Sequence, residues 1–296
     1  MFNYCFIYGI ILLPMGIGGK HMLKANYHTH TKLCNHAVGM PEDYIKKAIE
    51  LGFDELGMSD HAPVPREFMS EEEYIYNWIQ RNMTLDEYYS QYLPALDDAI
   101  SKYGDKIKVY RGLESEFIEG HEEYYAGLKA NLDYLNLGVH YFESNGKQLN
   151  SYADVNYETI YDYARCAIKG METGLFSCLV HPDLFFFEYK NEEGKQVFDE
   201  HCIEVSKMIL SKAEELGIYV EINANGLSNS RKYGHNDIWL YPYKDFWMLA
   251  KEYKNLKIVI GCDAHDPNNL YNEDVKAVIK FAEDLGLNVS SHMEIK

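Results

Sequence analysis

The feature that most constrains the fold is a regular alternation, from Lys24 onward, of short apolar runs with longer helical patterns. This alternation is typical of repeated βα units, in which helices connect parallel strands. Seven strands are expected, at residues 25–28, 55–58, 107–113, 134–139, 178–180, 219–222 and 257–260. Helices are expected between them, at residues 41–51, 84–103, 157–172, 198–216, 243–253 and 272–285.

Local signals support two of these helices. Pro41 suits the first turn of a helix, and Gly52 suits its end. Thr84 followed three residues later by Glu87 forms a capping-box pattern, which predicts the start of a helix that Gly104 ends. The pattern therefore indicates an α/β fold of the barrel type.

Residue types that bind metals follow six of the seven expected strands. In a parallel αβ barrel the carboxyl ends of the strands meet at one mouth, so these side chains should converge there. The sixth strand instead offers the amides of Asn223 and Asn225. The candidates are His28, His30, His61, Glu114, His140, His181, Asp263 and His265, with His36 from a nearby loop as a ninth.

Each candidate also has an ordinary structural interpretation. His140 and His181 could be buried core histidines, Asp263 could cap a turn, and Glu116 competes with Glu114 as the carboxylate ligand. Coincidence at six strand ends is nevertheless improbable. Seven histidines and two carboxylates exceed the four protein ligands of a closed zinc site, so two to three divalent ions are expected. Mixed imidazole and carboxylate ligands suit zinc, manganese or iron.

Several segments together resemble the PHP (polymerase and histidinol phosphatase) superfamily, particularly its stand-alone histidinol-phosphatase branch. The resemblance covers about residues 24 to 286 and rests on YHTHT, GMSDHAP, RGLESEF, LGVHYF, VHPDLF, EINANGL and GCDAHDP. It implies a distorted (β/α)7 barrel with a trinuclear metal centre at the carboxyl ends of the strands. One ion would be bound by His28, His30, Glu114 and Asp263, the second by Glu114, His140 and His181, and the third by His36, His61 and His265.

The resemblance also implies an activity, which is hydrolysis of L-histidinol phosphate in histidine biosynthesis. A metal-bound hydroxide would attack phosphorus, with Glu114 and Asp263 as supporting carboxylates. Arg231 is the expected phosphate clamp, and Asp183 is a candidate contact to a substrate amine, second-sphere support for a ligand or a helix cap. The alternatives are hydrolysis of another small phosphate ester or a nucleotide, and a non-catalytic metal-binding scaffold or regulatory module.

Charge and cysteine content limit the partners and the cellular compartment that are expected for this chain. The 28 basic and 46 acidic residues give a net charge of -18, which disfavours nucleic acid as a partner. The six cysteines form no C-x-x-C pair, so a reducing cytoplasm is expected. Residues 2–17 are apolar but short for a membrane span and interrupted by Pro14, so no membrane anchor is expected. Residues 1–23 are interpreted as an N-terminal extension and residues 24–296 as one barrel domain; the oligomeric state stays open.

Overall fold

Parallel strands form the centre of the molecule. The computed structural model describes residues 23–71, 81–236 and 238–295. Within these residues seven parallel strands pair in the order β1-β2-β3-β4-β7-β8-β9. The His30 N–H donates to the Ala264 carbonyl, and the Ala264 N–H donates to the His28 carbonyl. These bonds join the chain after β1 to the chain after β9, so the barrel is nearly closed. The predicted fold class is therefore confirmed.

The strands lie where the alternation predicted them, with shifted ends. Because β3 extends two residues past its expected end, Glu114 is the penultimate residue of the strand. The first strand is shorter than expected, and its ladder stops two residues before His28. The strands are β1 Ala25–Asn26, β2 Glu55–Met58, β3 Lys108–Ser115, β4 Tyr134–Leu137, β7 Cys178–Leu179, β8 Tyr219–Asn223 and β9 Lys257–Gly261.

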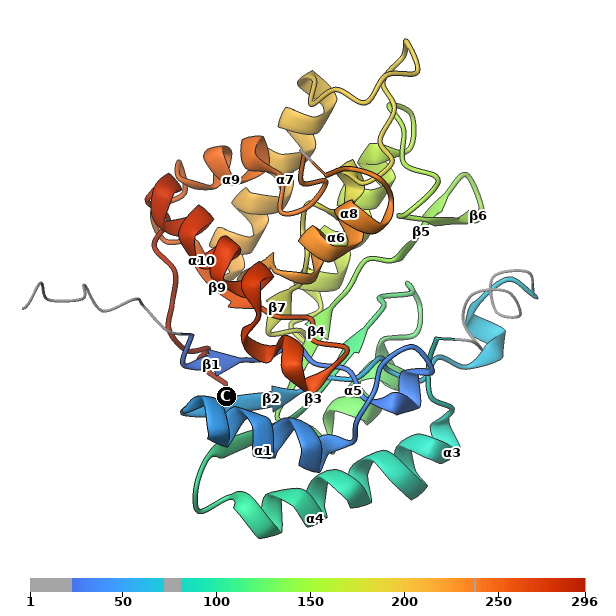
Figure 1. Cartoon of the computed structure of the whole chain (residues 1–296). Helices are drawn as coiled ribbons and strands as arrows, with labels where there is room; N and C mark the ends of the chain where they lie inside the picture. The colour runs from blue at the N-terminus through green and yellow to red at the C-terminus, as the bar shows by residue number, and fades with distance from the viewer. Residues whose placement is uncertain (1–22, 72–80, 237, 296) are drawn as a thin grey trace, which may run out of the picture.

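Helices cover the outside of the barrel, with α1 and α4 on one side and α7, α9 and α10 on another (Figure 1). Apolar faces make this packing favourable; in α1, for example, Tyr44, Ile45 and Ala48 are buried. The helices are α1 Pro41–Leu51, α3 Leu85–Glu87, α4 Leu93–Tyr103, α5 Glu122–Lys129, α6 Ile160–Glu172, α7 Glu200–Leu216, α8 Asn225–Lys232, α9 Lys244–Ala250 and α10 Glu273–Leu285.

The helix expected at residues 84–103 is not continuous α-helix. The capping box of Thr84 and Glu87 is present, but the segment Tyr88–Tyr92 is a π-helix between α3 and α4. Pro94 follows in the first turn of α4 and has no N–H to donate to the preceding turn. A local change in hydrogen-bond spacing at this point is consistent with that missing donor.

Two strands and two helices were missed by the prediction. The hairpin of β5 Tyr141–Ser144 and β6 Lys147–Asn150 projects beside the barrel, and α5 and α8 occupy segments expected to be loops (Figure 1). The hairpin had a signal, because its Asn145-Gly146 turn has two positive φ angles, of 52° and 73°, as a two-residue type I′ turn requires. No helix among the described residues is long and apolar enough to cross a membrane.

Candidate metal centre

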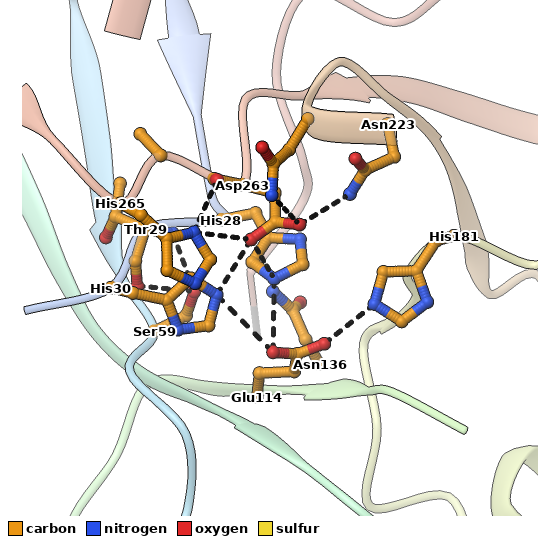
Figure 2. A network of polar contacts seen from close by, with 12 residues as sticks. His28, Thr29, His30, Ser59, Glu114, Asn136, His181, Asn223, Asp263 and His265 are labelled. Carbon is orange, nitrogen blue, oxygen red and sulfur yellow. Dashed lines mark hydrogen bonds and ion pairs between the residues drawn. The ribbon is translucent and has the colours of Figure 1, made fainter. Parts of the chain in front are cut away.

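Glu114 lies at the centre of a cluster of imidazoles at the carboxyl ends of the strands. Its side chain is 2% exposed, and its two oxygens face different histidines. One oxygen, Oε2, lies 3.3 Å from His28 Nε2 and 3.0 Å from His61 Nδ1. The other, Oε1, lies 2.9 Å from His181 Nε2 and 3.4 Å from His140 Nε2. Figure 2 shows this carboxylate between His28 and His30 on one side and His181 on the other. The geometry suits a carboxylate that bridges two ion positions.

A second carboxylate, that of Asp263 two residues after β9, completes the cluster. Asp263 Oδ1 lies 2.9 Å from His30 Nε2 and 3.6 Å from His28 Nε2. Its other oxygen accepts hydrogen bonds from the amides of Asn223, the last residue of β8, and Asn225, the first residue of α8. These amides therefore orient Asp263 and leave one of its oxygens for the imidazoles.

His36 and His265 form a more exposed pair at the edge of the cluster. The Nδ1 atom of each faces a backbone carbonyl, of Cys34 at 2.6 Å and of Asp263 at 3.0 Å respectively. Nδ1 is then the protonated nitrogen of each ring, and the two Nε2 lone pairs face each other across 3.0 Å. With His61, these rings bring three ligand atoms within 4.8 Å of one another. A cation between them would remove the repulsion of the lone pairs.

Burial lowers the pKa of His30, but the carboxylates of Asp263 and Asp60 outweigh this effect and raise that pKa to about 9, so a metal ion would bind there by displacing a proton. Other groups of the cluster suit metal binding directly. Burial, followed by the positive field of His30, lowers the pKa of His265 to about 3. Burial lowers the pKa of His61 well below its usual value, so both rings are neutral ligands at neutral pH. Burial alone would raise the pKa of Glu114, but the neighbouring histidines hold it well below its usual value. The carboxylate is therefore ionised.

Several buried atoms of the cluster have no hydrogen-bond partner among the described residues. They include the Nε2 atoms of His28 and His30 together with Glu114 Oε2 and Asp263 Oδ1. Buried polar atoms are rarely left in this state, because the loss of hydration is costly. His28, His30 and Asp263 also place one ligand atom each within 4.8 Å of one another, and so do His28, Glu114 and His181. The buried donor groups thus fit a site for more than one metal ion.

Strained backbone marks two of the strand ends. His181 and Asp263 have φ angles of 34° and 47°, positive values that few residues other than glycine adopt. Such strain persists where surrounding contacts enforce it, most often at functional sites. Gly138 serves the same arrangement, because a Cβ there would lie 2.5 Å from Glu114 Oε1.

The cluster opens into a cavity of about 570 Å³. His61, His140, Glu114, Asp263 and the pair His36 and His265 lie in its wall. Helix α8 contributes Asn225, Ser228, Asn229 and Lys232 to the wall, which also contains Arg81, Asn150 and Tyr152. The nine predicted metal ligands are therefore assembled beside this cavity; their roles as ligands stay a prediction.

The two predicted substrate residues lie elsewhere. Arg231 is half-exposed, is absent from the cavity wall and donates to Asp274 at 2.7 Å. No helix was expected at residues 225–232, but this segment is helix α8, and its rotation places Lys232 and not Arg231 in the wall. Asp183 is fully buried and accepts hydrogen bonds from the Tyr243 backbone and the Trp247 indole, so it holds the start of α9. Neither position supports the predicted contact with substrate.

Sequence reasoning missed the carboxylates that hold the histidines. Glu116, the rival ligand, accepts from His140 Nδ1 at 2.5 Å and from the His140 backbone N–H at 3.0 Å. Asp60 accepts from the Thr31 backbone and lies 3.6 Å from His30 Nδ1. Glu221 accepts from His28 Nδ1. For two of them a signal was available, because Glu116 lies two positions from Glu114 and Asp60 lies next to His61, whereas no predicted ligand lies near Glu221 in the sequence.

Comparison with known proteins gives one family. Residues 26–225 match the PHP domain family. A Deinococcus radiodurans protein named "Probable histidinol-phosphatase" is 25% identical over 266 residues, covering 88% of this chain and 92% of its own length. The Bacillus subtilis histidinol-phosphatase is 22% identical over 277 residues, covering 84% and 96%.

A solved structure has the same fold. It is a histidinol phosphate phosphatase from Lactococcus lactis in complex with zinc, L-histidinol and phosphate, with a TM-score of 0.62 and 17% identity. The alignment covers 90% of this chain and 95% of that one. The family match spans more than half of the chain and includes seven of the nine clustered residues. With its barrel and its strand-end histidines, this chain belongs to the PHP domain family.

Proposed function

We propose that this PHP-family phosphoesterase hydrolyses L-histidinol phosphate to L-histidinol and phosphate. The observation that carries the proposal is the placement of Glu114, whose two oxygens face separate sets of histidines beside the cavity. The substrate class follows from the Lactococcus lactis protein of the same fold, which is described with L-histidinol and phosphate bound. It is supported by relatives named histidinol-phosphatase over most of the chain.

Three ligand sets would hold the ions. They are His28, His30, Glu114 and Asp263; Glu114, His140 and His181; and His36, His61 and His265. Divalent ions bound there would supply Lewis-acid charge and a water of lowered pKa for attack on a phosphate ester.

The chain's own groups would bind and orient the substrate. Lys232 and Arg81 are cations of the cavity wall and suit the non-reacting oxygens of a phosphate. Ser228, Asn229 and Tyr152 offer neutral donors and acceptors for the organic part of the ester. Substrate choice within the family would reside in such wall residues, because the fold itself does not determine the substrate.

A screen of phosphate monoesters with metal-loaded protein tests this function. L-histidinol phosphate should have the highest kcat/KM, measured as release of inorganic phosphate. A clear preference for a nucleotide or a sugar phosphate would show that the substrate is another ester and not L-histidinol phosphate. No phosphate release from any ester, with the metals bound, would favour a scaffold or regulatory module.

A further inference from the structure

A buried carboxylate on β8 contacts two of the proposed ligands at once. Glu221 is 2% exposed, and its Oε1 lies 2.8 Å from His28 Nδ1. Its Oε2 accepts from the backbone N–H of His181 at 3.1 Å and from the Asn223 amide at 3.0 Å. One side chain thus joins the end of β1, the end of β7 and the end of β8.

Each contact fixes a feature that metal binding needs. With Glu221 accepting at Nδ1, the other nitrogen of His28, Nε2, is the atom that faces Glu114 and Asp263. The His181 N–H is held while this residue adopts its φ of 34°, so the carboxylate also supports a strained backbone. Carboxylates behind ligating histidines fix ring orientation in this way and raise ligand basicity.

The neighbouring strand leaves room for this carboxylate. Gly261 ends β9 and pairs in register with Asn223. A Cβ at Gly261 would lie 1.5 Å from Glu221 Oε1 and 2.3 Å from Glu221 Cδ. Any larger residue at position 261 would therefore displace the carboxylate from His28.

We infer that Glu221 is a positioning residue, which presents His28 Nε2 and the His181 side chain to a shared pair of metal ions. This inference rests on the proposed metal-dependent function. This role requires that both side-chain oxygens of residue 221 accept hydrogen bonds, because the partners of each oxygen are N–H groups. Only a carboxylate meets this requirement.

Glu221→Gln tests the requirement with almost no change of shape. If the amide oxygen faces His28, the NH₂ group meets the two donors of His181 and Asn223. If the amide is reversed, His28 must accept at Nδ1, and Nε2 then carries the proton and loses its lone pair. Either orientation damages one proposed ligand.

The measurement is the Kd for Zn²⁺ of metal-stripped protein, titrated against a chromophoric chelator. Glu221→Gln should weaken zinc binding by roughly 10- to 100-fold. Glu55→Gln is the matched control, because Glu55 lies on β2 at the opposite end of the barrel, where it accepts from Tyr27. Its zinc affinity should equal that of the wild type.

Two further variants separate positioning from a general loss of structure. Gly261→Ala, which leaves Glu221 in the chain, should weaken zinc binding as Glu221→Gln does. In a His28→Ala background, Glu221→Gln should cost less affinity than it does alone, since part of its effect passes through His28.

An unchanged zinc Kd in Glu221→Gln would overturn the inference, and so would a loss that is fully additive with His28→Ala and absent in Gly261→Ala. Wild-type protein that binds no zinc would instead contradict the proposed function itself.

Discussion

At the residue scale, the two acidic side chains of the RGLESEF segment have different tasks. Nitrogen atoms of five histidines lie within 3.4 Å of the Glu114 carboxylate. The Glu116 carboxylate instead accepts from the ring and the backbone N–H of His140 and from the Tyr141 N–H. Glu114 lies in β3 and Glu116 directly follows the strand. Residues two apart in an extended chain point to the same face, so the spacing alone could not separate these two carboxylates.

Replacing these carboxylates one at a time should give graded effects. We expect Glu114→Gln to lower kcat by about 10²- to 10³-fold or more, because a central charge is lost. Glu116→Gln should cost roughly 10- to 100-fold in activity or zinc affinity, as expected for a residue behind a ligand. Phosphate-release kinetics with metal analysis would measure both. A larger loss for Glu116→Gln than for Glu114→Gln would reverse the assignment.

The adjacent cations of α8 provide a second comparison. Lys232 lies in the cavity wall and Arg231 pairs with Asp274 on α10. Lys232→Met should lower kcat/KM for a phosphate ester by about 10-fold, equivalent to about 1.4 kcal/mol, without changing metal content. Arg231→Met is the matched control and should leave kcat/KM nearly unchanged, since an exposed ion pair contributes little. The opposite ranking would restore Arg231 as the phosphate contact.

At the element scale, the strands and most helices were predictable because they depend on local pattern. Apolar runs gave the strands, and Pro41, Gly52 and Thr84 mark helix ends that the structure retains. Helix α8 was not predictable. Its sequence, NGLSNSRK, has low helix propensity, and the helix forms where Leu227 is buried and Asn223 Oδ1 accepts from the Gly226 N–H. Those contacts are tertiary, so no local pattern could reveal them.

The strands also carry glycines that the interior of the barrel requires. Tyr134 on β4 is fully buried and donates from its hydroxyl to the Tyr27 carbonyl across the barrel. A Cβ at Gly112 on β3 would lie 2.3 Å from Tyr134 Cζ, and one at Gly57 on β2 would lie 2.2 Å from the hydroxyl oxygen. Close passage of this ring therefore excludes side chains at both positions.

Gly112→Ala should lower the free energy of unfolding by about 1 to 3 kcal/mol through overpacking. Denaturant unfolding of metal-free protein measures the change. Gly127→Ala on α5 is the control, because nothing lies within 4 Å of its Cβ, and it should be neutral or stabilising. In a Tyr134→Leu background the cost of Gly112→Ala should shrink; an equal cost there would mean that the clash with Tyr134 is not its cause.

At the scale of the whole molecule, one buried acid should make stability depend on pH. Burial raises the pKa of Asp183 from 3.8 to about 7 in the folded protein. Because the folded state holds the proton more tightly, this contribution to stability is complete below about pH 4 and is lost as the pH rises through about 7.

Asp183→Asn removes the ionisable carboxyl, so the variant has no pH-dependent contribution to stability from this position. The wild type should lose about 2 kcal/mol relative to the variant between about pH 5.5 and about pH 8, at about 1.4 kcal/mol per pKa unit. Unfolding free energies at the two pH values, both without metal, measure the difference. A difference between the two proteins that does not change with pH would show that Asp183 is ionised throughout.

The arrangement of whole strands predicted that the site residues lie together, but it did not predict the contacts that support them. Parallel strands bring their carboxyl ends to one mouth, so strand-end residues as distant as His28 and Asp263 could be expected together. Glu221 gave no comparable signal, because no predicted ligand lies near it in the sequence and its role depends on which ring nitrogen of His28 it faces. The cavity wall depends on α8 and the β5–β6 hairpin, and neither was expected.

The central claim is that the strand-end cluster binds metal ions that the phosphoesterase requires. The most direct measurement is a titration of metal-stripped protein with Zn²⁺ or Mn²⁺, following both bound metal and phosphate release from L-histidinol phosphate. We predict two to three equivalents bound per chain, with activity absent in the stripped protein and rising as the sites fill. Full activity with one ion or none bound would contradict the account.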